Sequence, residues 1–394
     1  MTPSGRSGPT IRLGRRHRGA RAHPWIYRNE IAAVEGEPDA GGIVTVRGGD
    51  GELLGRGFYN PRTSLACRLV TRRDEAVDAE LFFRRIQAAI DHRRSLGARD
   101  AMRVIWSEAD GLPGLVADRY GDVVVLQCLT LGMSRALPWI AAGLRATLGD
   151  LPIFLSDDPT AARLEGFGAR QEWLDQVGPS AIEIREGACR FMVRPGLGHK
   201  TGFYLDQADN RQLVARRAVG RPVLDAFCYV GAFAVHALHG GATHALLLDS
   251  SAAALAEAQV NLELNELAGR AELRQANAFD ELRRLEGDGA RFGVVILDPP
   301  PFTRRKEALD AAARGYKEIN LRAMRLLEHR GLLATFSCSH HVSPARFEEI
   351  CREAAGDAGV LLRVIRSLTQ SPDHPILLTV PETRYLKGLL LERL

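Results

Sequence analysis

One cysteine of this chain stands where it could do covalent chemistry. Cys338 lies in TFSCSHHV (residues 335–342), directly after the apolar run 332–334. A thiol after a buried strand is commonly an inert core residue, whereas a thiol at the mouth of a site can react as the thiolate. The motif alone favours burial. His340 and His341 receive no role, and because a fourth ligand is lacking we expect no metal site with Cys338.

Polar side chains also follow other apolar runs of the C-terminal half. Asp225, Asp249, Asn277 and Asp298 each end such a run or follow it directly. The runs cover residues 222–227, 244–249, 271–276, 293–298 and 332–337, and the predicted helices cover 232–239, 252–266, about 306–329 and 344–355. This alternation predicts an α/β fold, a mostly parallel sheet with helices on both faces, that binds ligands at the carboxyl ends of its strands.

The loop after the first run, DAFCYVGAF (residues 225–233), indicates which ligand this edge would take. It has one glycine, Gly231, and lacks the GxGxxG pattern that cradles a pyrophosphate, which argues against NAD or FAD. Asp249, 18 residues further on, could accept hydrogen bonds from both hydroxyls of a ribose. It could instead cap the next helix, although Ser250 and Ser251 are there to do so. A nucleoside without phosphates fits this pattern best.

LDPPPF (residues 297–302) combines a carboxylate, three prolines and an aromatic ring. Proline fixes φ and lacks an N–H group, so this loop is rigid and cannot continue the strand. Asp298 could accept a hydrogen bond from a base or amine, Pro299 and Pro300 would present free carbonyls, and Phe302 could stack on a planar ring. A purely structural proline turn is the alternative.

Composition narrows the class of protein. A chain of 394 residues, 45% hydrophobic and 25% charged, is long enough for two or three domains. It has no apolar run of membrane-spanning length and no secretory signal pattern, so we expect a cytoplasmic protein without a membrane partner. Its six scattered cysteines should be free thiols.

Arginine supplies nearly all of the positive charge, because only four of the 52 basic residues are lysines. This bias could reflect genomic base composition. The first thirty residues nevertheless suit a phosphate-contacting surface, since they hold seven arginines before their first acid, Glu30. The seven are Arg6, Arg12, Arg15, Arg16, Arg18, Arg21 and Arg28.

Three domains are predicted. Short apolar alternations broken by turn residues indicate a small β-rich module over residues 10–72, and therefore a domain at 1–75. A helix over 78–97, three strands, a helix over 134–148 and a strand over 152–156 give a central α+β domain at 76–190. Its acids Glu108, Asp110 and Asp118 lie among glycines and proline, which favours a turn role over acid–base work. The α/β domain takes 191–394.

Several motifs, in this order and spacing, resemble those of a known family. They are EADGLPGLVADRYGD, GLGHKTGFYLDQADNR, VLDAFCYVGAF, LLLDSSAAALAEAQVNLELN, NAFDEL, VILDPPPF and TFSCSHH. Together they resemble the class I S-adenosylmethionine-dependent methyltransferases, specifically bacterial 23S ribosomal RNA cytosine-C5 methyltransferases with an N-terminal PUA domain. The resemblance extends from HPWIYRNEI (residues 23–31) to ETRYLK (residues 382–387).

The resemblance implies a Rossmann-like methyltransferase domain, S-adenosyl-L-methionine as cofactor, and roles for individual residues. Asp225, Phe227 and Gly231 would line the methionine end of the cofactor, Asp249 its ribose and Asn277 its adenine. Further cofactor-binding candidates are Asp298, Tyr204, Gln207 and Arg211. Asn277 departs from the family, which usually has Asp there. Since an amide oxygen can still accept from the adenine amino group, we expect altered affinity but retained binding.

For catalysis, the resemblance makes Cys338 the nucleophile that adds to C6 of cytosine, with Asp298 stabilising the N3-protonated ring. Pro301 stands where another branch of RNA methyltransferases has a second cysteine, which leaves the base for the C5 proton open between water, His340 and His341. Cys228 is interpreted as packing. RNA, and 23S ribosomal RNA in particular, is the implied partner, bound in part by the PUA-like domain. Relatives also suggest a homodimer.

Two other functions stay open at this stage. A methyltransferase that acts on an exocyclic amine or a guanine nitrogen would need Asp298 and its prolines but not Cys338. A non-catalytic RNA-binding or assembly protein would keep the fold without binding the cofactor.

Overall fold

The structure, a computed structural model, describes residues 8–14, 23–196, 201–302 and 309–394. The chain forms two compact units, each made of three segments. The first unit comprises Met1–Ile182, Val193–Phe203 and Pro372–Thr383, and the second comprises Glu183–Met192, Tyr204–Ser371 and Arg384–Leu394. The three-domain division with borders near residues 75 and 190 stays a prediction. None of the described helices is long and apolar enough to cross a membrane.

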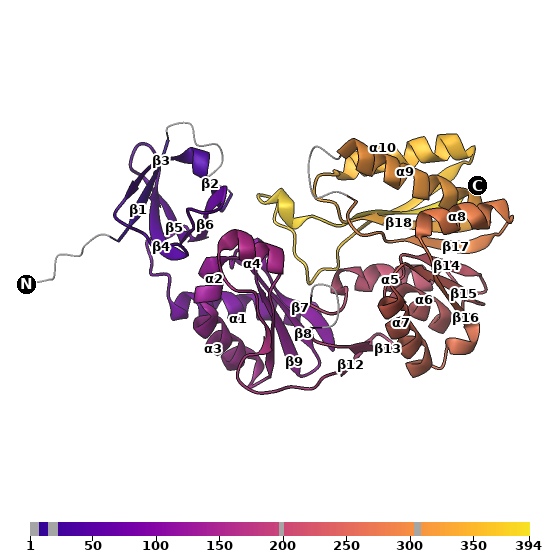
Figure 1. Cartoon of the computed structure of the whole chain (residues 1–394), viewed down its shortest axis with the longest axis horizontal. Coiled ribbons are helices and arrows are strands. Elements are labelled where there is room, and N and C mark those ends of the chain that lie inside the picture. The colour runs from indigo at the N-terminus through magenta and orange to yellow at the C-terminus, as the bar shows by residue number, and fades with distance from the viewer. Residues whose placement is uncertain (1–7, 15–22, 197–200, 303–308) are drawn as a thin grey trace, which may run out of the picture. The chain divides into compact units, whose positions relative to one another are not determined.

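A six-stranded sheet opens the first unit, which confirms the predicted β-rich module (Figure 1). Its strands are β1 (Thr10–Leu13), β2 (Trp25–Tyr27), β3 (Ile31–Glu35), β4 (Gly42–Arg47), β5 (Leu53–Tyr59) and β6 (Leu65–Thr71), in the order β2-β6-β5-β4-β1-β3. Alternate residues such as Ile11, Leu13, Val44 and Val46 point inward and form its core. The period-2 pattern read from the sequence therefore reflects one buried face.

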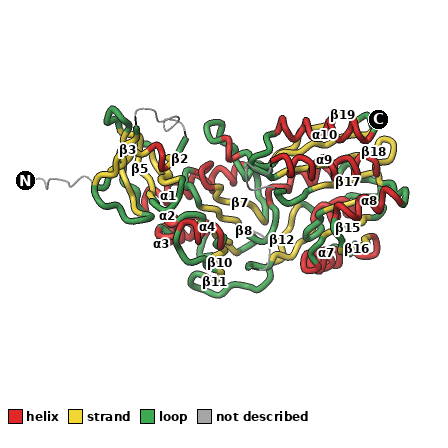
Figure 2. The backbone as a smooth tube through the Cα atoms, turned by 45° about the horizontal axis from the view of Figure 1, so that its top comes forward, coloured by secondary structure: helices red, strands yellow, loops and turns green. Residues whose placement is uncertain are grey.

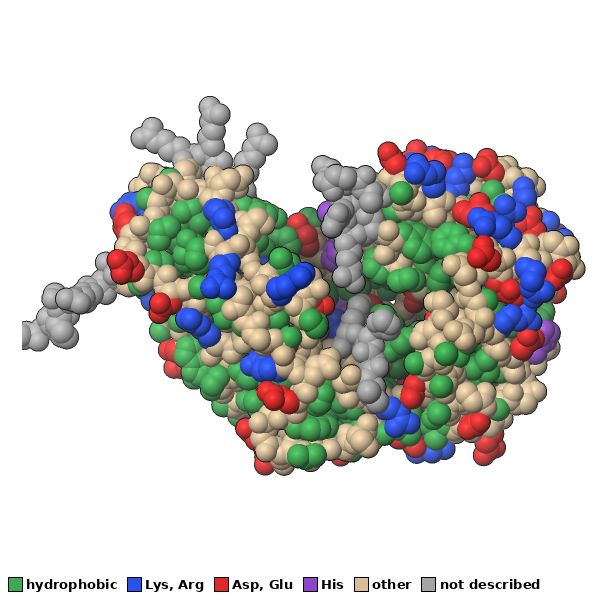
Figure 3. Space-filling model, in the orientation of Figure 1, with side chains coloured by type: hydrophobic (Ala, Val, Ile, Leu, Met, Phe, Trp, Pro, Cys, Tyr) green, Lys and Arg blue, Asp and Glu red, His purple; other side chains and the backbone are tan. Residues whose placement is uncertain are grey.

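Part of the basic N-terminal cluster falls within the described residues. Arg12 pairs with Glu35, and Arg28 donates a hydrogen bond to the carbonyl of Thr63 at 3.0 Å. Figure 3 shows separate basic side chains over the visible face of this unit. Five arginines of the cluster lie outside the described residues, namely Arg6, Arg15, Arg16, Arg18 and Arg21.

A five-stranded sheet completes the first unit. Its order is β11-β10-β9-β8-β7, from β7 (Ala101–Trp106), β8 (Leu115–Tyr120), β9 (Val123–Cys128), β10 (Ile153–Ser156) and β11 (Gln171–Trp173). The accompanying helices are α1 (Ala79–Ser95), α2 (Leu131–Arg135), α3 (Leu137–Leu148) and α4 (Pro159–Glu165). The sequence predicted one helix over 134–148. The break falls at Ala136, because Pro138 occupies the first turn of a new helix.

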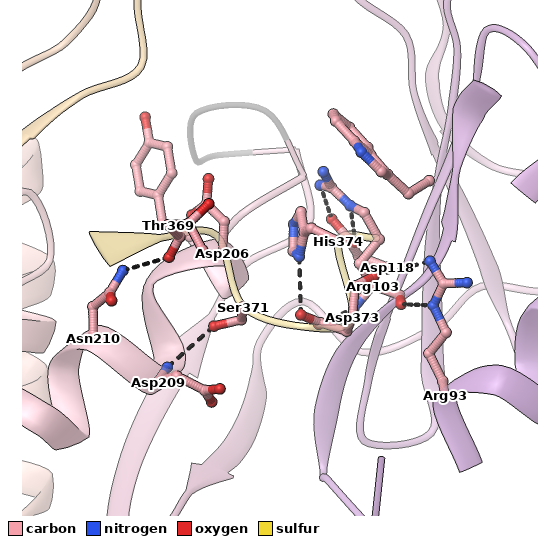
Figure 4. A network of polar contacts seen from close by, with 12 residues as sticks. Arg93, Arg103, Asp118, Asp206, Asp209, Asn210, Thr369, Ser371, Asp373 and His374 are labelled. Atoms are coloured by element: carbon pink, nitrogen blue, oxygen red, sulfur yellow. Dashed lines mark hydrogen bonds and ion pairs between the residues drawn. The ribbon is translucent and has the colours of Figure 1, made fainter. Parts of the chain in front are cut away.

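Buried charges link this sheet to a distant segment of the same unit. Arg103 binds both oxygens of Asp118 at 2.8 Å, and its backbone N–H donates to Asp373 at 2.9 Å. Arg93 donates to the carbonyl of Asp373 at 2.9 Å (Figure 4). Asp118 thus lies within β8 in a buried ion pair, not in a turn as its sequence neighbours indicated.

The second unit has a seven-stranded sheet with helices on both faces, as predicted. Helices α5, α6 and α7 cover one face, and α8, α9 and α10 cover the other (Figure 1); Figure 2 shows the strands as a layer between helices. The strand order is β16-β15-β14-β17-β18-β20-β19. The strands are β14 (Val223–Ala226), β15 (Ala245–Asp249), β16 (Ala271–Gln275), β17 (Phe292–Leu297), β18 (Leu327–Ser337), β19 (Leu362–Thr369) and β20 (Lys387–Arg393). The helices are α5 (Ala208–Ala215), α6 (Ala232–His239), α7 (Ala252–Leu264), α8 (Ala278–Gly287), α9 (Leu309–Leu326) and α10 (Pro344–Ala358).

Some elements of this unit were not predicted. The first five strands run parallel, but β20 is antiparallel to β18, and β19 is antiparallel to β20. The buried run of β20, KGLLLER, has no polar alternation to mark it as a strand. A two-stranded sheet, β12 (Ile182–Glu186) with β13 (Cys189–Val193), was also missed. A helix was expected up to residue 329, but strand β18 already begins at Leu327. Residues 327–330 thus belong to the strand although they precede its apolar run.

Candidate active site at the carboxyl edge of the second sheet

Strand register brings the predicted site residues to one edge. Ala226 at the end of β14 pairs with Leu297 at the end of β17, and Leu297 pairs with Thr335 in β18. Asp298 therefore leaves the sheet between the loop that follows β14 and the turn that carries Cys338. The meeting of strand ends expected from the sequence is confirmed.

Asp225 is the most deeply buried carboxylate of this edge. Its side chain is 1% exposed and accepts a hydrogen bond from the backbone N–H of Ala234 at 3.1 Å. Burial raises the pKa of Asp225 to about 8, and the nearby charges of Asp298 and Asp249 act in the same direction. The charges of Asp298 and Asp249 thus oppose the ionisation of Asp225, and an edge that gathers these carboxylates favours a cationic ligand and disfavours a pyrophosphate.

The loop after β14 has an unusual backbone. Phe227, Tyr229 and Gly231 have φ angles of 64°, 51° and 73°, in the left-handed region that non-glycine residues rarely adopt. At Gly231 a Cβ atom would lie 2.8 Å from Cδ2 of Leu247 and 3.2 Å from Cβ of Ala258. Glycine is therefore required for both the turn and the close packing of helix on strand.

Asp249 is held at the end of β15 by two backbone donors. The N–H groups of Tyr229 and Ser251 each donate to one carboxylate oxygen at 2.9 Å. The N-cap of α7 is Ser251, whose hydroxyl accepts from Ala254 N–H at 3.2 Å. Asp249 is thus not the capping residue, which removes the structural alternative considered for it and leaves its remaining lone pairs for a ligand.

Tyr204, Gln207 and Arg211 lie around the short 3-10 helix Leu205–Gln207 and α5. Arg211 is buried, binds both oxygens of Glu186 at 2.6 Å and donates to the carbonyl of Tyr204 at 2.9 Å. The ring of Tyr204 meets that of Tyr229 edge-on at 5.1 Å. Arg211 therefore positions the segment that carries Tyr204, whereas Gln207 has a buried amide nitrogen with no partner among the described residues.

Asn277 and Phe302 already have structural partners. The side-chain oxygen of Asn277 accepts from Phe279 N–H at 2.9 Å and caps α8, which uses one of its two lone pairs. The Phe302 ring lies 4.5 Å from that of Tyr316 and 6.4 Å from that of Phe227. This packing anchors the proline loop. Adenine binding by Asn277 and base stacking by Phe302 stay predictions.

Cys338 differs in exposure from the other cysteines. It is partly exposed, while the other five are buried. Its Sγ lies 3.9 Å from the carbonyl oxygen of Pro299, the first proline after Asp298, and Pro300 beside it is exposed. Burial raises the pKa of Cys228 well above its ordinary value, in keeping with the packing role expected for it. The structure thus places the one accessible thiol beside the proline loop.

Sequence reasoning missed Asp206 and Tyr385, which lie near the predicted Tyr204 at this edge. Burial, with the nearby charges of Tyr229, Asp298, Asp206 and Cys338, raises the pKa of Tyr204. The Tyr385 hydroxyl donates to Asp206. Neither Asp206 nor Tyr385 ends a parallel strand, so the pattern of strand ends could not reveal them.

The fold and the strand-end residues define a class I methyltransferase. Residues 166–391 match the family model of S-adenosylmethionine-dependent methyltransferases, and residues 10–72 match a PUA-like domain. A solved structure from Streptococcus mutans, described as a putative SAM-dependent methyltransferase, is similar to this chain. It aligns with a TM-score of 0.84 at 18% identity, over 97% of this chain and 99% of that one. A second solved structure, described as the putative methyltransferase SMU.776 complexed with SAH, gives the same score, identity and coverage.

The sequence relatives narrow this class. Ribosomal RNA large subunit methyltransferase I of Erwinia tasmaniensis is 38% identical over 389 residues, 96% of this chain and 98% of the relative. The same enzyme of Tolumonas auensis is 39% identical over 94% of this chain and 95% of the relative. The chain belongs to the ribosomal RNA large subunit methyltransferase I family.

The residues present fit S-adenosylmethionine. Its sulfonium and ammonium groups are positive, which suits the edge formed by Asp225, Asp249 and Asp298, and it has no phosphate to conflict with them. Gln207 offers a buried amide donor that pairs with no other described residue. The carboxylate of Asp249 suits the two hydroxyls of a ribose.

Proposed function

We propose that this protein methylates C5 of a cytosine in large-subunit ribosomal RNA, with Cys338 as the nucleophile that adds to C6. The observation that carries the proposal is the partly exposed Sγ of Cys338, 3.9 Å from the carbonyl of Pro299 and beside the loop of Asp298. Family membership supports ribosomal RNA as the substrate, since the relatives are named for the large subunit. An RNA substrate of this kind also supports a cytoplasmic location.

The chemistry of cytosine explains why a thiol is needed. C5 is a weak nucleophile, and S-adenosylmethionine supplies an electrophilic methyl group when bound. Addition of the Cys338 thiolate to C6 makes the ring enamine-like and raises the electron density at C5. After methyl transfer, loss of the C5 proton lets the bond between Sγ and C6 break and restores both the ring and the thiolate.

Asp298 and the prolines hold the base in this proposal. Asp298 accepts a hydrogen bond from the cytosine edge and stabilises the ring protonated at N3, while the carbonyls of Pro299 and Pro300 face the base without competing N–H groups. Pro301 cannot act as a base, so the C5 proton leaves to water, His340 or His341. Both histidines are exposed.

The first unit would hold the RNA. Extrusion of a paired base costs a few kcal/mol, so single-stranded or loosely structured RNA is the favoured substrate. The PUA-like domain supplies backbone contacts through exposed arginines such as Arg12, whose side chain is 46% exposed. A homodimer stays a prediction.

The test uses ribosomal RNA that contains 5-fluorocytidine. The full chain is incubated with this RNA and S-adenosylmethionine, and a denaturing gel is used to detect protein bound covalently to RNA. Fluorine at C5 cannot leave as a proton does, so the adduct is trapped. We expect an adduct with the wild type and with Cys351→Ala, which changes a buried cysteine of α10, but none with Cys338→Ala.

Two results would contradict the proposal. Full methylation activity in Cys338→Ala would indicate a target amine or guanine nitrogen. Absence of cofactor binding by calorimetry in the wild type would indicate a non-catalytic RNA-binding protein. Mass spectrometry of the methylated nucleoside separates the first result from the proposed 5-methylcytosine.

A further inference from the structure

Lys387 lies at the same sheet edge as Cys338 although the two are 49 residues apart. It is the first residue of β20 and pairs with Ser337, the last residue of β18. Because β20 runs antiparallel to its neighbour, its beginning meets the carboxyl ends of the parallel strands. Strand direction therefore places a lysine next to the turn that carries the nucleophile.

The ammonium group of Lys387 is buried and held in place. The residue is 6% exposed, and its Nζ donates a hydrogen bond to the carbonyl oxygen of Ser339 at 2.5 Å. None of the ion pairs found between described residues includes Lys387, whereas the exposed Lys317 pairs with Glu353 and Asp357. A buried lysine without a carboxylate partner carries a large desolvation cost, which calls for a functional explanation.

The charge of Lys387 acts on Cys338. Burial lowers the pKa of Lys387 to about 8, and the negative charge of a Cys338 thiolate opposes this lowering. The ammonium form is therefore still the main form at neutral pH. Lysine is also the exception in this chain, since only four of its 52 basic residues are lysines.

Two tyrosines, which a raised pKa keeps neutral at neutral pH, and a backbone carbonyl also lie near Cys338. Tyr204 and Tyr316 have their pKa raised by burial first and also by the charge of Cys338, and Asp298 acts on Tyr204 as well. The carbonyl of Pro299 faces Sγ with its negative end. Lys387 carries a positive charge that can offset a negative sulfur at Cys338.

We propose that Lys387 is a positioning residue whose ammonium group stabilises the thiolate of Cys338 through its place against the Cys338–Ser339 turn. The inference rests on the proposed function, in which Cys338 is the nucleophile. When the thiol ionises, its proton goes to solvent, and Lys387 keeps its own proton and its hydrogen bond to Ser339. The resulting pair joins a buried ammonium group to a partly exposed thiolate and forms without RNA.

Alkylation of Cys338 by iodoacetamide tests this without RNA or cofactor. The full chain is treated over a range of pH, and mass spectrometry follows the peptide that contains Cys338; the buried Cys351 reports any unfolding. We expect Lys387→Met and Lys387→Gln to react about tenfold more slowly at neutral pH, with the pH–rate curve moved to higher pH. Glutamine can still donate to Ser339, so it separates the charge from the hydrogen bond.

Two further variants complete the design. Lys387→Arg keeps the charge and should react within a few-fold of the wild type, and Lys317→Met, which removes an exposed lysine, should leave the curve unchanged. A folded Lys387→Gln or Lys387→Met with the wild-type curve would overturn the inference. The proposed function fails separately, if Cys338→Ala keeps its methylation activity, because alkylation needs no catalytic turnover.

Discussion

Asp225→Asn should change how the stability of the second unit depends on pH. Asparagine keeps the shape of the side chain and can still accept the hydrogen bond from Ala234, but it cannot ionise. In the native protein the pKa of Asp225 is raised from 3.8 to about 8, chiefly by burial. A raised native pKa stabilises the fold below the unfolded value, and this contribution is lost as pH rises toward the native value.

The size of the effect follows from the proton balance. Between about pH 4 and pH 7 the unfolded carboxyl has lost its proton while the native one keeps it, which costs the wild type roughly 1.4 kcal/mol for each pH unit. The variant has no such cost. Its free energy of unfolding should therefore gain about 4 kcal/mol relative to the wild type between pH 4 and pH 7.

The chain provides an internal control for this measurement. All four tryptophans, at positions 25, 106, 139 and 173, lie in the first unit, so their fluorescence during urea denaturation reports that unit. Far-UV circular dichroism reports both. We expect the pH-dependent difference in the dichroism transition and none in the fluorescence transition. Asp280→Asn, which removes an exposed carboxylate of α8, serves as the matched control.

The refuting result is a stability difference between Asp225→Asn and the wild type that stays constant from pH 4 to pH 7. It would mean that Asp225 is ionised in the native protein like an ordinary carboxylate. The account of Asp225 as a carboxyl group that burial keeps neutral in the native protein would then lose its support.

Two other variants test the positions of site residues. Arg211→Met leaves the buried Glu186 with only His236 of its two partners. Although burial alone would raise the pKa of Glu186, the charges and hydrogen bonds of Arg211 and His236 lower it to about 2. We expect the second unit to lose roughly 3–5 kcal/mol in circular dichroism-monitored urea denaturation, and a loss below about 1 kcal/mol would contradict this account. Asp249→Asn keeps a side-chain oxygen but replaces the other by an amide that faces the N–H of Tyr229 or Ser251. We expect calorimetry to show S-adenosylhomocysteine bound roughly tenfold or more weakly, with unchanged affinity as the contrary result.

Asp225 and Lys387 are both buried at the same edge of the sheet. Burial raises the pKa of Asp225 and lowers that of Lys387, so each is shifted toward its neutral form. A negative sulfur at Cys338 favours the charged form of Lys387, and a cationic cofactor would favour the charged form of Asp225. The protonation of both groups should therefore respond to the charge that is placed beside them.

Much of the site could be predicted from the sequence because its residues end parallel strands. The apolar runs before Asp225, Asp249 and Asp298 identify strands by their composition, and strand ends of a parallel sheet share one edge. The single glycine at Gly231 and the prolines after Asp298 indicated tight backbone by local rules alone. These features depend only on residues that are neighbours in the sequence, so the sequence alone predicts them.

Other features were decided only by the tertiary structure. The antiparallel return of β20 brings Lys387 beside Cys338, and no pattern within either segment specifies that pairing. The sequence neighbours of Asp118 predicted a turn, but Asp118 lies within β8 and forms an ion pair with Arg103 of β7. The exposure of Cys338 likewise depends on which segments of the chain pack over the end of β18. Burial, charge coupling and contacts between distant segments arise from packing, because they are properties of neighbours in space and not of neighbours in sequence.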